Sequence, residues 1–186
     1  MGRVVVGAAV SLDGFASDPQ GNLDALYPDL DALRETEVLQ ESIRNTGAAI
    51  LGRRAYDMAE NPDYYAEGYE YQVPLFILTH HPPAVKPREA GGLTFTYVTD
   101  GIESAVRQAK AAAGARDVTV VGGQSTFRQC VNAGLADELH LDIVPVLLGD
   151  GLPLWKGVDP AALRLERIAV IPMPGGRTHL RYRILH

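Results

Sequence analysis

The chain has 186 residues, of which 46% are hydrophobic and 22% charged, enough apolar material for one substantial core, and this excludes a disordered chain. The formal net charge is -6, and the basic residues are scattered rather than gathered in a run. A surface of this kind is poorly suited to neutralising nucleic-acid phosphates, so we expect no nucleic-acid partner.

Cysteine content and hydropathy limit the location of the chain. Cys130 is the only cysteine, so no intramolecular disulfide can form and no Cys-x-x-Cys pair is available for zinc. No stretch of about 18 uncharged apolar residues is present, and the first residues lack the apolar core of an export signal. We therefore expect a cytoplasmic protein with no membrane partner.

Strand and helix patterns alternate through the first half of the chain. Residues 4–10 form a continuous apolar run, which is typical of a strand buried on both faces. Apolar residues then recur at helical spacing from Asp29 until Gly47. The following segments are predicted as a strand at 48–52, a short helix at 53–60 and a strand at 73–79.

The second half continues this alternation and ends in a hairpin. A strand at 94–98 precedes a helix that we expect Asp100 to cap, and a strand at 118–121 precedes a helix at 125–132. A long strand at 138–148 contains Pro145, which predicts a bend or bulge. Residues 163–171 and 178–185 flank a Pro- and Gly-rich turn and predict an antiparallel hairpin. We expect a single α/β domain over residues 1–186, with a mixed sheet.

A pair of glycines follows the strand at 118–121. Gly122 and Gly123 stand between this buried strand and the next helix. Glycine allows a ligand to approach the backbone closely, and the free N–H groups at a helix start attract phosphate. The same residues also suit a tight turn without a ligand, because the motif lacks the Gly-x-Gly-x-x-Gly spacing and the Walker lysine.

Two other strand ends carry polar groups. Gly52 is followed by Arg53 and Arg54, whose planar guanidinium groups match phosphate oxygens. Thr79 and His80 end the next strand. Each element alone also fits a solvated turn, but ligands of parallel sheets bind beyond the carboxyl ends of the strands. The three ends together favour nucleotide binding, and we expect no metal, because no acid or cysteine completes a shell around the histidine pair at residues 80–81.

Three further features leave alternatives open. His140 alternates with apolar neighbours and faces either a polar cleft or solvent. Asp13 begins a loop that reaches Pro28 and either covers a site or forms an ordinary Asp-Gly turn. The tyrosines at residues 64–71 either pack on one another, which we favour, or line a pocket.

The order of these motifs resembles the dihydrofolate-reductase-like superfamily, and more closely the C-terminal reductase domain of riboflavin-biosynthesis proteins. The similarity spans nearly the whole chain. It rests on the segments 8–14 (Ala-Ala-Val-Ser-Leu-Asp-Gly), 51–56 (Leu-Gly-Arg-Arg-Ala-Tyr), 121–125 (Val-Gly-Gly-Gln-Ser), 137–141 (Asp-Glu-Leu-His-Leu) and 145–151 (Pro-Val-Leu-Leu-Gly-Asp-Gly). The pair of segments from 137 to 151 is the most specific of these, because it is long and ordered.

The resemblance implies a three-layer fold with a central, mostly parallel sheet, NADPH as hydride donor and a homodimer. It implies a cis peptide bond between the two glycines of the 122–123 turn. It also places a set of residues at the cofactor: Ala9, Gly52, Arg53, Arg54, Thr79, His80, Gly122, Gly123, Gln124, Ser125 and Thr126. On the substrate side we expect Gly149, Asp150, Gly151 and His140, with Asp13 as a candidate proton donor.

The sequence departs from classical dihydrofolate reductases at the cofactor and substrate sites. Ala55 and Gln124 replace a threonine and a third glycine, and the acid of the first helix has three candidates, Asp29, Asp31 and Glu35. The sequence therefore predicts an NADPH-dependent reductase that transfers hydride to a C=N or C=O bond of a small pyrimidine- or pterin-like heterocycle. The alternative is a nucleotide-binding or regulatory module with the same cleft and no turnover.

Overall fold

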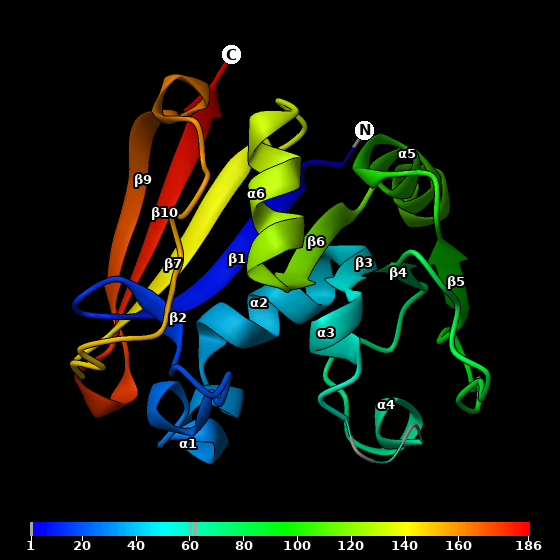
Figure 1. The fold of residues 1–186 in the computed structure, drawn as a ribbon, viewed down its shortest axis with the longest axis horizontal. Coiled ribbons are helices and arrows are strands. Elements are labelled where there is room, and N and C mark those ends of the chain that lie inside the picture. The colour runs from blue at the N-terminus through cyan, green and yellow to red at the C-terminus, as the bar shows by residue number, and fades with distance from the viewer. Residues whose placement is uncertain (1, 60, 62) are drawn as a thin grey trace.

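A computed structural model describes residues 2–59, 61 and 63–186, and an eight-stranded sheet runs through its centre (Figure 1). The strand order is β5-β4-β3-β6-β1-β7-β10-β9. All strands from β5 to β7 in this spatial order, that is β5, β4, β3, β6, β1 and β7, are parallel to one another. β10 pairs antiparallel with both β7 and β9. The strands of the large sheet are β1 (Val4–Ser11), β3 (Thr46–Gly52), β4 (Leu75–Leu78), β5 (Phe95–Val98), β6 (Asp117–Gly122), β7 (Glu138–Val144), β9 (Arg164–Pro172) and β10 (Thr178–Leu185).

Helices lie in the connections between the parallel strands, except between β4 and β5, which are joined by a loop. The α-helices are α1 (Leu30–Arg34), α2 (Glu37–Asn45), α3 (Arg53–Tyr56), α4 (Tyr64–Glu67), α5 (Ile102–Ala113) and α6 (Gln124–Asn132). Short 3-10 turns occur at Asp24–Leu26, Pro160–Ala162 and Pro174–Gly176. No helix among the described residues is long and apolar enough to cross a membrane. The mixed sheet and the C-terminal antiparallel hairpin confirm the predicted fold class.

Apolar side chains pack on both faces of the sheet. On one face, α5 and α6 cover alternate residues of the central strands, including Ile50, Val120 and Leu139. In Figure 1, α6 lies across β6 and β1. The other face buries Leu51 and Ile77 against a tyrosine-rich segment. Each fully buried aliphatic side chain contributes about 1.5–3 kcal/mol, so the sheet is held from both sides.

The tyrosine-rich segment is part of this second core. Tyr65 is buried, and its ring stacks on Tyr56 at a centroid distance of 5.2 Å. Tyr69 meets the Tyr65 ring edge-on at 5.1 Å, and Tyr71 is also buried. Packing of the rings on one another is therefore confirmed.

Several predicted boundaries are wrong for local reasons. The helix predicted from Asp29 is broken, because Thr36 adopts an extended conformation and its hydroxyl caps α2 by accepting from the Leu39 N–H. Asp100 caps nothing, since Gly101 occupies the N-cap of α5 without a side-chain hydrogen bond. The strand predicted at 138–148 ends at Val144, because the following proline has no N–H for the ladder.

Two other differences concern loops. The helix predicted at 53–60 ends at Tyr56, and Glu60 lies outside the described residues. The loop between Asp13 and Pro28 contains a strand, β2 (Phe15–Ser17), which pairs antiparallel with β8 (Leu152–Pro153). This two-stranded sheet ties the loop to the segment that follows β7.

Candidate functional site

The carboxyl ends of the parallel strands bring the predicted turns together. Leu51 of β3 pairs with Gly122 of β6, and Gly52 pairs with Leu78 of β4. The turns that follow β3, β4 and β6 therefore lie at one edge of the sheet, as the sequence predicts. In this position they suit a ligand bound beyond the strand ends.

The glycines of two of these turns are in direct contact. A Cβ at Gly52 would lie 2.5 Å from Thr126 Oγ1 and 3.6 Å from the Cα of Gly123. A Cβ at Gly123 would lie 3.3 Å from the Cα of Gly52, and Gly123 has a φ of 91°, which favours glycine. Side chains on these glycines would not fit, so the edge presents bare backbone.

The start of α6 presents donors at this edge. Gly123 is the N-cap of α6, and no side chain caps the helix. The backbone N–H groups of Gln124, Ser125 and Thr126 have no acceptor within the helix and favour an anion. The side chain of Gln124 points elsewhere, because its Nε2 donates to the backbone oxygens of Leu154 and Lys156.

The peptide bond between Gly122 and Gly123 is trans, as are all peptide bonds among the described residues. The cis bond expected from the resemblance is therefore wrong for this chain. The left-handed φ of Gly123 makes the turn into α6 without it.

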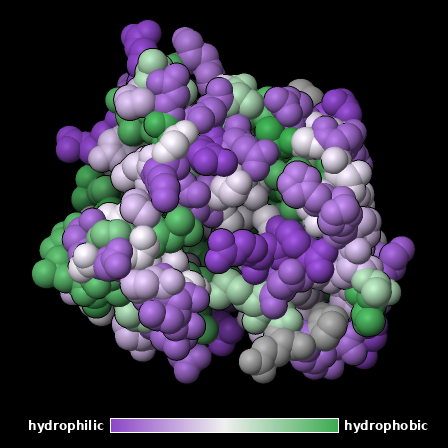
Figure 2. Space-filling view, viewed as in Figure 1, coloured by the Kyte–Doolittle hydropathy of each residue, from purple (hydrophilic) through white to green (hydrophobic). Residues whose placement is uncertain are grey.

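The two arginines after Gly52 differ in their partners. Arg53 Nε lies 2.8 Å from both carboxylate oxygens of Asp57, and its Nη1 donates to the backbone oxygen of His81. Arg54 is exposed, and no carboxylate of the described residues lies within ion-pair distance of it. In Figure 2, hydrophilic side chains gather in the middle of the face, near α3. Arg54 is therefore the guanidinium group that remains available to a phosphate.

At the end of β4, one side chain is held by hydrogen bonds within its own turn and the next one is exposed. The Thr79 hydroxyl donates to the His81 backbone oxygen at 2.8 Å and accepts from its N–H at 3.2 Å. Thr79 is buried, whereas His80 is exposed. Of these two residues, His80 is the one whose side chain is free to contact a ligand.

Asp13 ties the end of β1 to the loop after β7. Its carboxylate accepts from Ser11 Oγ at 2.6 Å, from Gly149 N at 2.7 Å and from Leu148 N at 3.2 Å. The hydrogen bond from Ser11, followed by the one from Gly149, holds the pKa of Asp13 below its usual value. This places Gly149 beside the end of β1, and it favours an anchoring role for Asp13 over proton donation.

The neighbouring loop residues are also fixed by the backbone. Asp150 accepts from the Gly151 N–H at 2.7 Å. A Cβ at Gly151 would lie 2.0 Å from the backbone oxygen of Ser17, so a larger residue would separate this loop from β2. Gly149, Asp150 and Gly151 therefore stand at the end of β1, at the same edge of the sheet as the glycine turns.

His140 lies on the sheet face opposite α5 and α6. Its Nε2 is 3.1 Å from Glu138 Oε2, and its ring meets that of His179 edge-on at 5.4 Å. Burial lowers the pKa of His140, which favours the neutral ring. Of the two surroundings considered from the sequence, His140 thus occupies a half-buried polar one.

None of the three acids considered near the first helix points freely into the site. Asp29 forms a 2.8 Å ion pair with Arg177, which is buried. Asp31 and Glu35 are exposed. Sequence reasoning missed Arg177 and the pair formed by Asp142 and His179, whose atoms Oδ1 and Nδ1 lie 2.7 Å apart. The alternation of polar and apolar residues along β7 could have indicated that its polar side chains share one face of the sheet.

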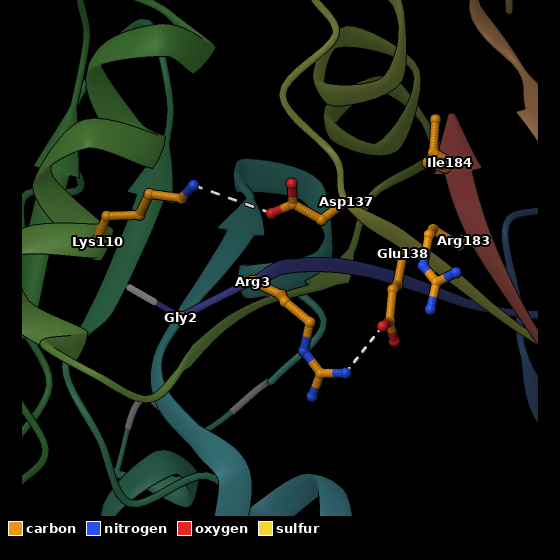
Figure 3. A pocket seen from close by; sticks show the side chains of 7 residues that line it. All are labelled: Gly2, Arg3, Lys110, Asp137, Glu138, Arg183 and Ile184. Atoms are coloured by element: carbon orange, nitrogen blue, oxygen red, sulfur yellow. Dashed lines mark hydrogen bonds and ion pairs between the residues drawn. The ribbon is translucent and has the colours of Figure 1, made fainter. Parts of the chain in front are cut away.

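A hollow of about 340 Å³ lies at the opposite edge of the sheet, beside the amino ends of the parallel strands (Figure 3). Its charged side chains all have partners: Arg3 contacts Asp117 at 2.6 Å and Glu138 at 2.8 Å, Lys110 lies 3.9 Å from Asp137, and Arg183 contacts Glu166 at 2.6 Å. These pairs leave little charge for a ligand, so the hollow is better explained as structural. In the described part of the chain, no group of three metal-ligating side chains converges.

The arrangement is similar to known proteins. YyaP of Bacillus subtilis (strain 168) is 30% identical over 166 residues, which cover 84% of this chain and 81% of YyaP. A Shewanella sp. PV-4 protein that is described as a riboflavin biosynthesis protein has a similar structure. Its TM-score is 0.79 at 21% identity, and 99% of each chain is covered. Dihydrofolate reductase from Enterococcus faecalis, in complex with NADP(H), gives a TM-score of 0.62 at 16% identity, over 99% of this chain and 97% of the reductase.

A family model extends over most of the chain. The model of the RibD C-terminal domain matches residues 3–173. This range contains the turns that follow β3, β4 and β6 and the loop after β7. The chain therefore belongs to the RibD C-terminal domain family, within a dihydrofolate-reductase-like fold.

Proposed function

We propose that this protein is an NADPH-dependent reductase that transfers hydride to a C=N or C=O bond of a small heterocyclic, pyrimidine- or pterin-like substrate. The observation that carries the proposal is the contact between Gly52 and Gly123, which leaves bare backbone beside the uncapped start of α6. Membership of the RibD C-terminal domain family supports a reductase, and the NADP(H) in the Enterococcus faecalis enzyme supports the cofactor class.

The residues at this edge fit a dinucleotide phosphate. The N–H groups at the start of α6 suit a pyrophosphate, because the helix end carries a partial positive charge. Arg54 and His80 are exposed and add donors for a ribose phosphate. Arg53 holds the 79–81 turn through the backbone oxygen of His81 and thereby positions that edge.

The residues at the end of β1 and in the loop after β7 orient the reactants and exclude water. When bound, the nicotinamide supplies the hydride, and we place it along the backbone of Ala9 in β1. Asp13 keeps the loop around Gly149 against the end of this strand. Leu12 and Leu147 are exposed on the two segments and provide apolar surface that would be covered by bound reactants.

The experiment that tests the cofactor site is a fluorescence titration with NADPH. Arg54→Glu should weaken binding by about 10- to 100-fold, the range for losing one charge-assisted hydrogen bond. Arg107→Glu makes the same charge change at an exposed position of α5, away from this edge and from any carboxylate it could pair with among the described residues, and is the matched control. Equal affinities of the two variants and the wild type would contradict the proposed phosphate site.

A nucleotide-binding module without turnover is the second candidate. It is favoured by the three hydrogen bonds that hold Asp13 as a carboxylate, which leave the expected proton donor unsuited to that role. Oxidation of NADPH with a panel of aminopyrimidines and pterins separates the two functions. Tight NADPH binding with no turnover on any compound would favour the module.

A further inference from the structure

A polar pair stands on the face of the sheet beside the end of β1. In the strand register, Asp142 of β7 lies between Ala9 of β1 and His179 of β10. Side chains of directly paired residues point to the same face, and those of consecutive residues alternate. Because Leu141 packs with the α5 and α6 core, Asp142 and His179 point to the opposite face. Asp142 is thus one strand away from the position proposed for the nicotinamide.

The hydrogen bonds of His179 determine its protonation. Arg181 Nε, which can only donate, lies 3.1 Å from His179 Nε2, so this nitrogen must accept. The ring proton is therefore on Nδ1, which donates to Asp142 Oδ1 at 2.7 Å. His179 is neutral, buried and fully hydrogen-bonded, and it fixes the orientation of the carboxylate.

The arginines around Asp142 are committed to other acids. Arg181 pairs with Glu41 of α2 at 2.8 Å, and Arg177 pairs with Asp29 at 2.8 Å. The Asp142 side chain is 23% exposed, and no hydrogen bond from the described residues reaches its Oδ2. A neutral imidazole does not balance the negative charge of a half-buried carboxylate, and it leaves one carboxylate oxygen without a hydrogen bond. A ligand with N–H groups would supply the missing hydrogen bonds.

Tyr27 and Arg177 enclose the same region. The Arg177 guanidinium lies 5.6 Å from the centre of the Tyr27 ring. Arg177 Nε and Nη1 are buried and have no hydrogen-bond partner in the described part of the chain. Burial, followed by the charge of Asp142, raises the pKa of Tyr27 to about 12, so its hydroxyl stays protonated. Tyr27 is thus near enough to Asp142 to be affected by its charge, and the Arg177 packed against Tyr27 carries two donors without a partner among the described residues.

We infer that Asp142 recognises the substrate ring: its carboxylate, oriented by His179, accepts hydrogen bonds from the N–H edge of a nitrogen heterocycle. The inference rests on the proposed function and specifies the substrate class. The two oxygens of a carboxylate match a ring N–H and a neighbouring amino group. His179 is a positioning residue, since it acts through Asp142.

The same contact assists reduction of a C=N bond. A carboxylate stabilises the protonated ring nitrogen, whose proton comes from solvent. Hydride addition then forms a C–H bond at the carbon, and the C=N π electrons become a lone pair on the nitrogen, which keeps its proton. Bound NADPH would supply the hydride and with it the two electrons that reduce the ring.

The test uses 2-aminopyridine, a ring that presents an N–H and an amino group once it is protonated. We expect it to bind the NADPH-saturated protein with a dissociation constant on the order of 1 mM, as a small fragment should. Asp142→Asn replaces an acceptor by a donor at constant shape and should weaken binding at least tenfold. Asp31→Asn removes the same charge from an exposed position and should change nothing.

The role of His179 needs its own readout. His179→Leu removes the donor to Asp142 and should weaken 2-aminopyridine binding, whereas His179→Asn keeps a side-chain N–H and should restore most of it. The affinity for NADPH should stay constant in all of these variants, which also confirms that the cofactor edge is folded. Equal binding of 2-aminopyridine to Asp142→Asn and wild type would overturn the inference, and so would equal binding of aniline, which lacks the ring nitrogen.

Failure of the proposed function gives a different result. If the wild type does not bind NADPH, the proposed function fails, and titration of the free protein with 2-aminopyridine still decides the role of Asp142. If the wild type binds NADPH but not 2-aminopyridine, the inference is overturned and the cofactor site stands.

Discussion

A methyl group at Gly52 provides the sharpest test of the contact between the two glycine turns. The backbone of Gly52 is extended, with a φ of -74°, so alanine adopts it without strain. Its Cβ, however, would lie 2.5 Å from Oγ1 of the buried Thr126, closer than real Cβ contacts come. Overpacking of this kind costs about 1–3 kcal/mol. For a chain of this size, the melting temperature should fall by about 2–12 °C.

The assay combines denaturant unfolding with the NADPH titration. Gly52→Ala should lower the denaturation midpoint at an unchanged m-value and should also weaken NADPH binding, because the Gly123 turn must move. Thr126→Ala removes the obstructing oxygen, so the double variant should be more stable than the sum of the two single effects predicts, by at least about 1 kcal/mol. Gly7→Ala, whose Cβ meets nothing closer than 3.9 Å, is the control. A Gly52→Ala protein with wild-type stability and affinity would refute the reasoning.

Three other predictions follow from burial, charge and the sheet edge. Because the folded pKa of Asp13 is lowered, its charge stabilises the protein above the unfolded pKa and this contribution is lost as the pH falls through the folded value. The melting temperatures of wild type and Asp13→Asn should thus converge below about pH 4, and a constant difference would contradict the anchoring role. Burial raises the pKa of Cys130 to about 12, so a thiol reagent at pH 8 should modify it only after unfolding in urea, and rapid native labelling would show that the site opens. We also propose a homodimer through the edge strand β9, where Ile168 and Val170 are exposed. Light scattering should give twice 20.1 kDa, and Val170→Lys, but not the control Val85→Lys, should give the monomer; a wild-type monomer would contradict the proposal.

Hydrophobic periodicity predicted the alternation of strands and helices, because it follows from burial, which the sheet imposes on every strand. The apolar run before Gly52 and the one before Gly122 could only be buried strands, and both are. The predicted ends of helices and strands were wrong where the conformation or hydrogen bond of a single residue determines the end. Asp100 has the right side chain for a cap, but Gly101 occupies the N-cap with a φ of 102°, and sequence spacing does not distinguish the two positions.

The meeting of the three turns at one sheet edge could be predicted because each of them is a local motif at the end of a parallel strand. The partners of their side chains could not, because they depend on contacts across the fold. The engagement of Arg53 with Asp57 and the 79–81 turn, which leaves Arg54 available, is one example. The pair formed by Asp142 and His179 is another, since the two residues are 37 positions apart and meet only through the register of β7 and β10.

With the proposed NADPH site at this edge, the contact between Gly52 and Gly123 would also link cofactor binding to folding. These turns touch only when β3 and β6 are paired in register, so an unfolded chain has no such site. A ligand that binds only the native state stabilises it by mass action, by about 2.7 kcal/mol at a free concentration 100 times its dissociation constant. Thermal shift in the presence of nicotinamide nucleotides therefore measures the integrity of a parallel strand pairing at the centre of the molecule, and it can rank cofactors before any substrate is identified.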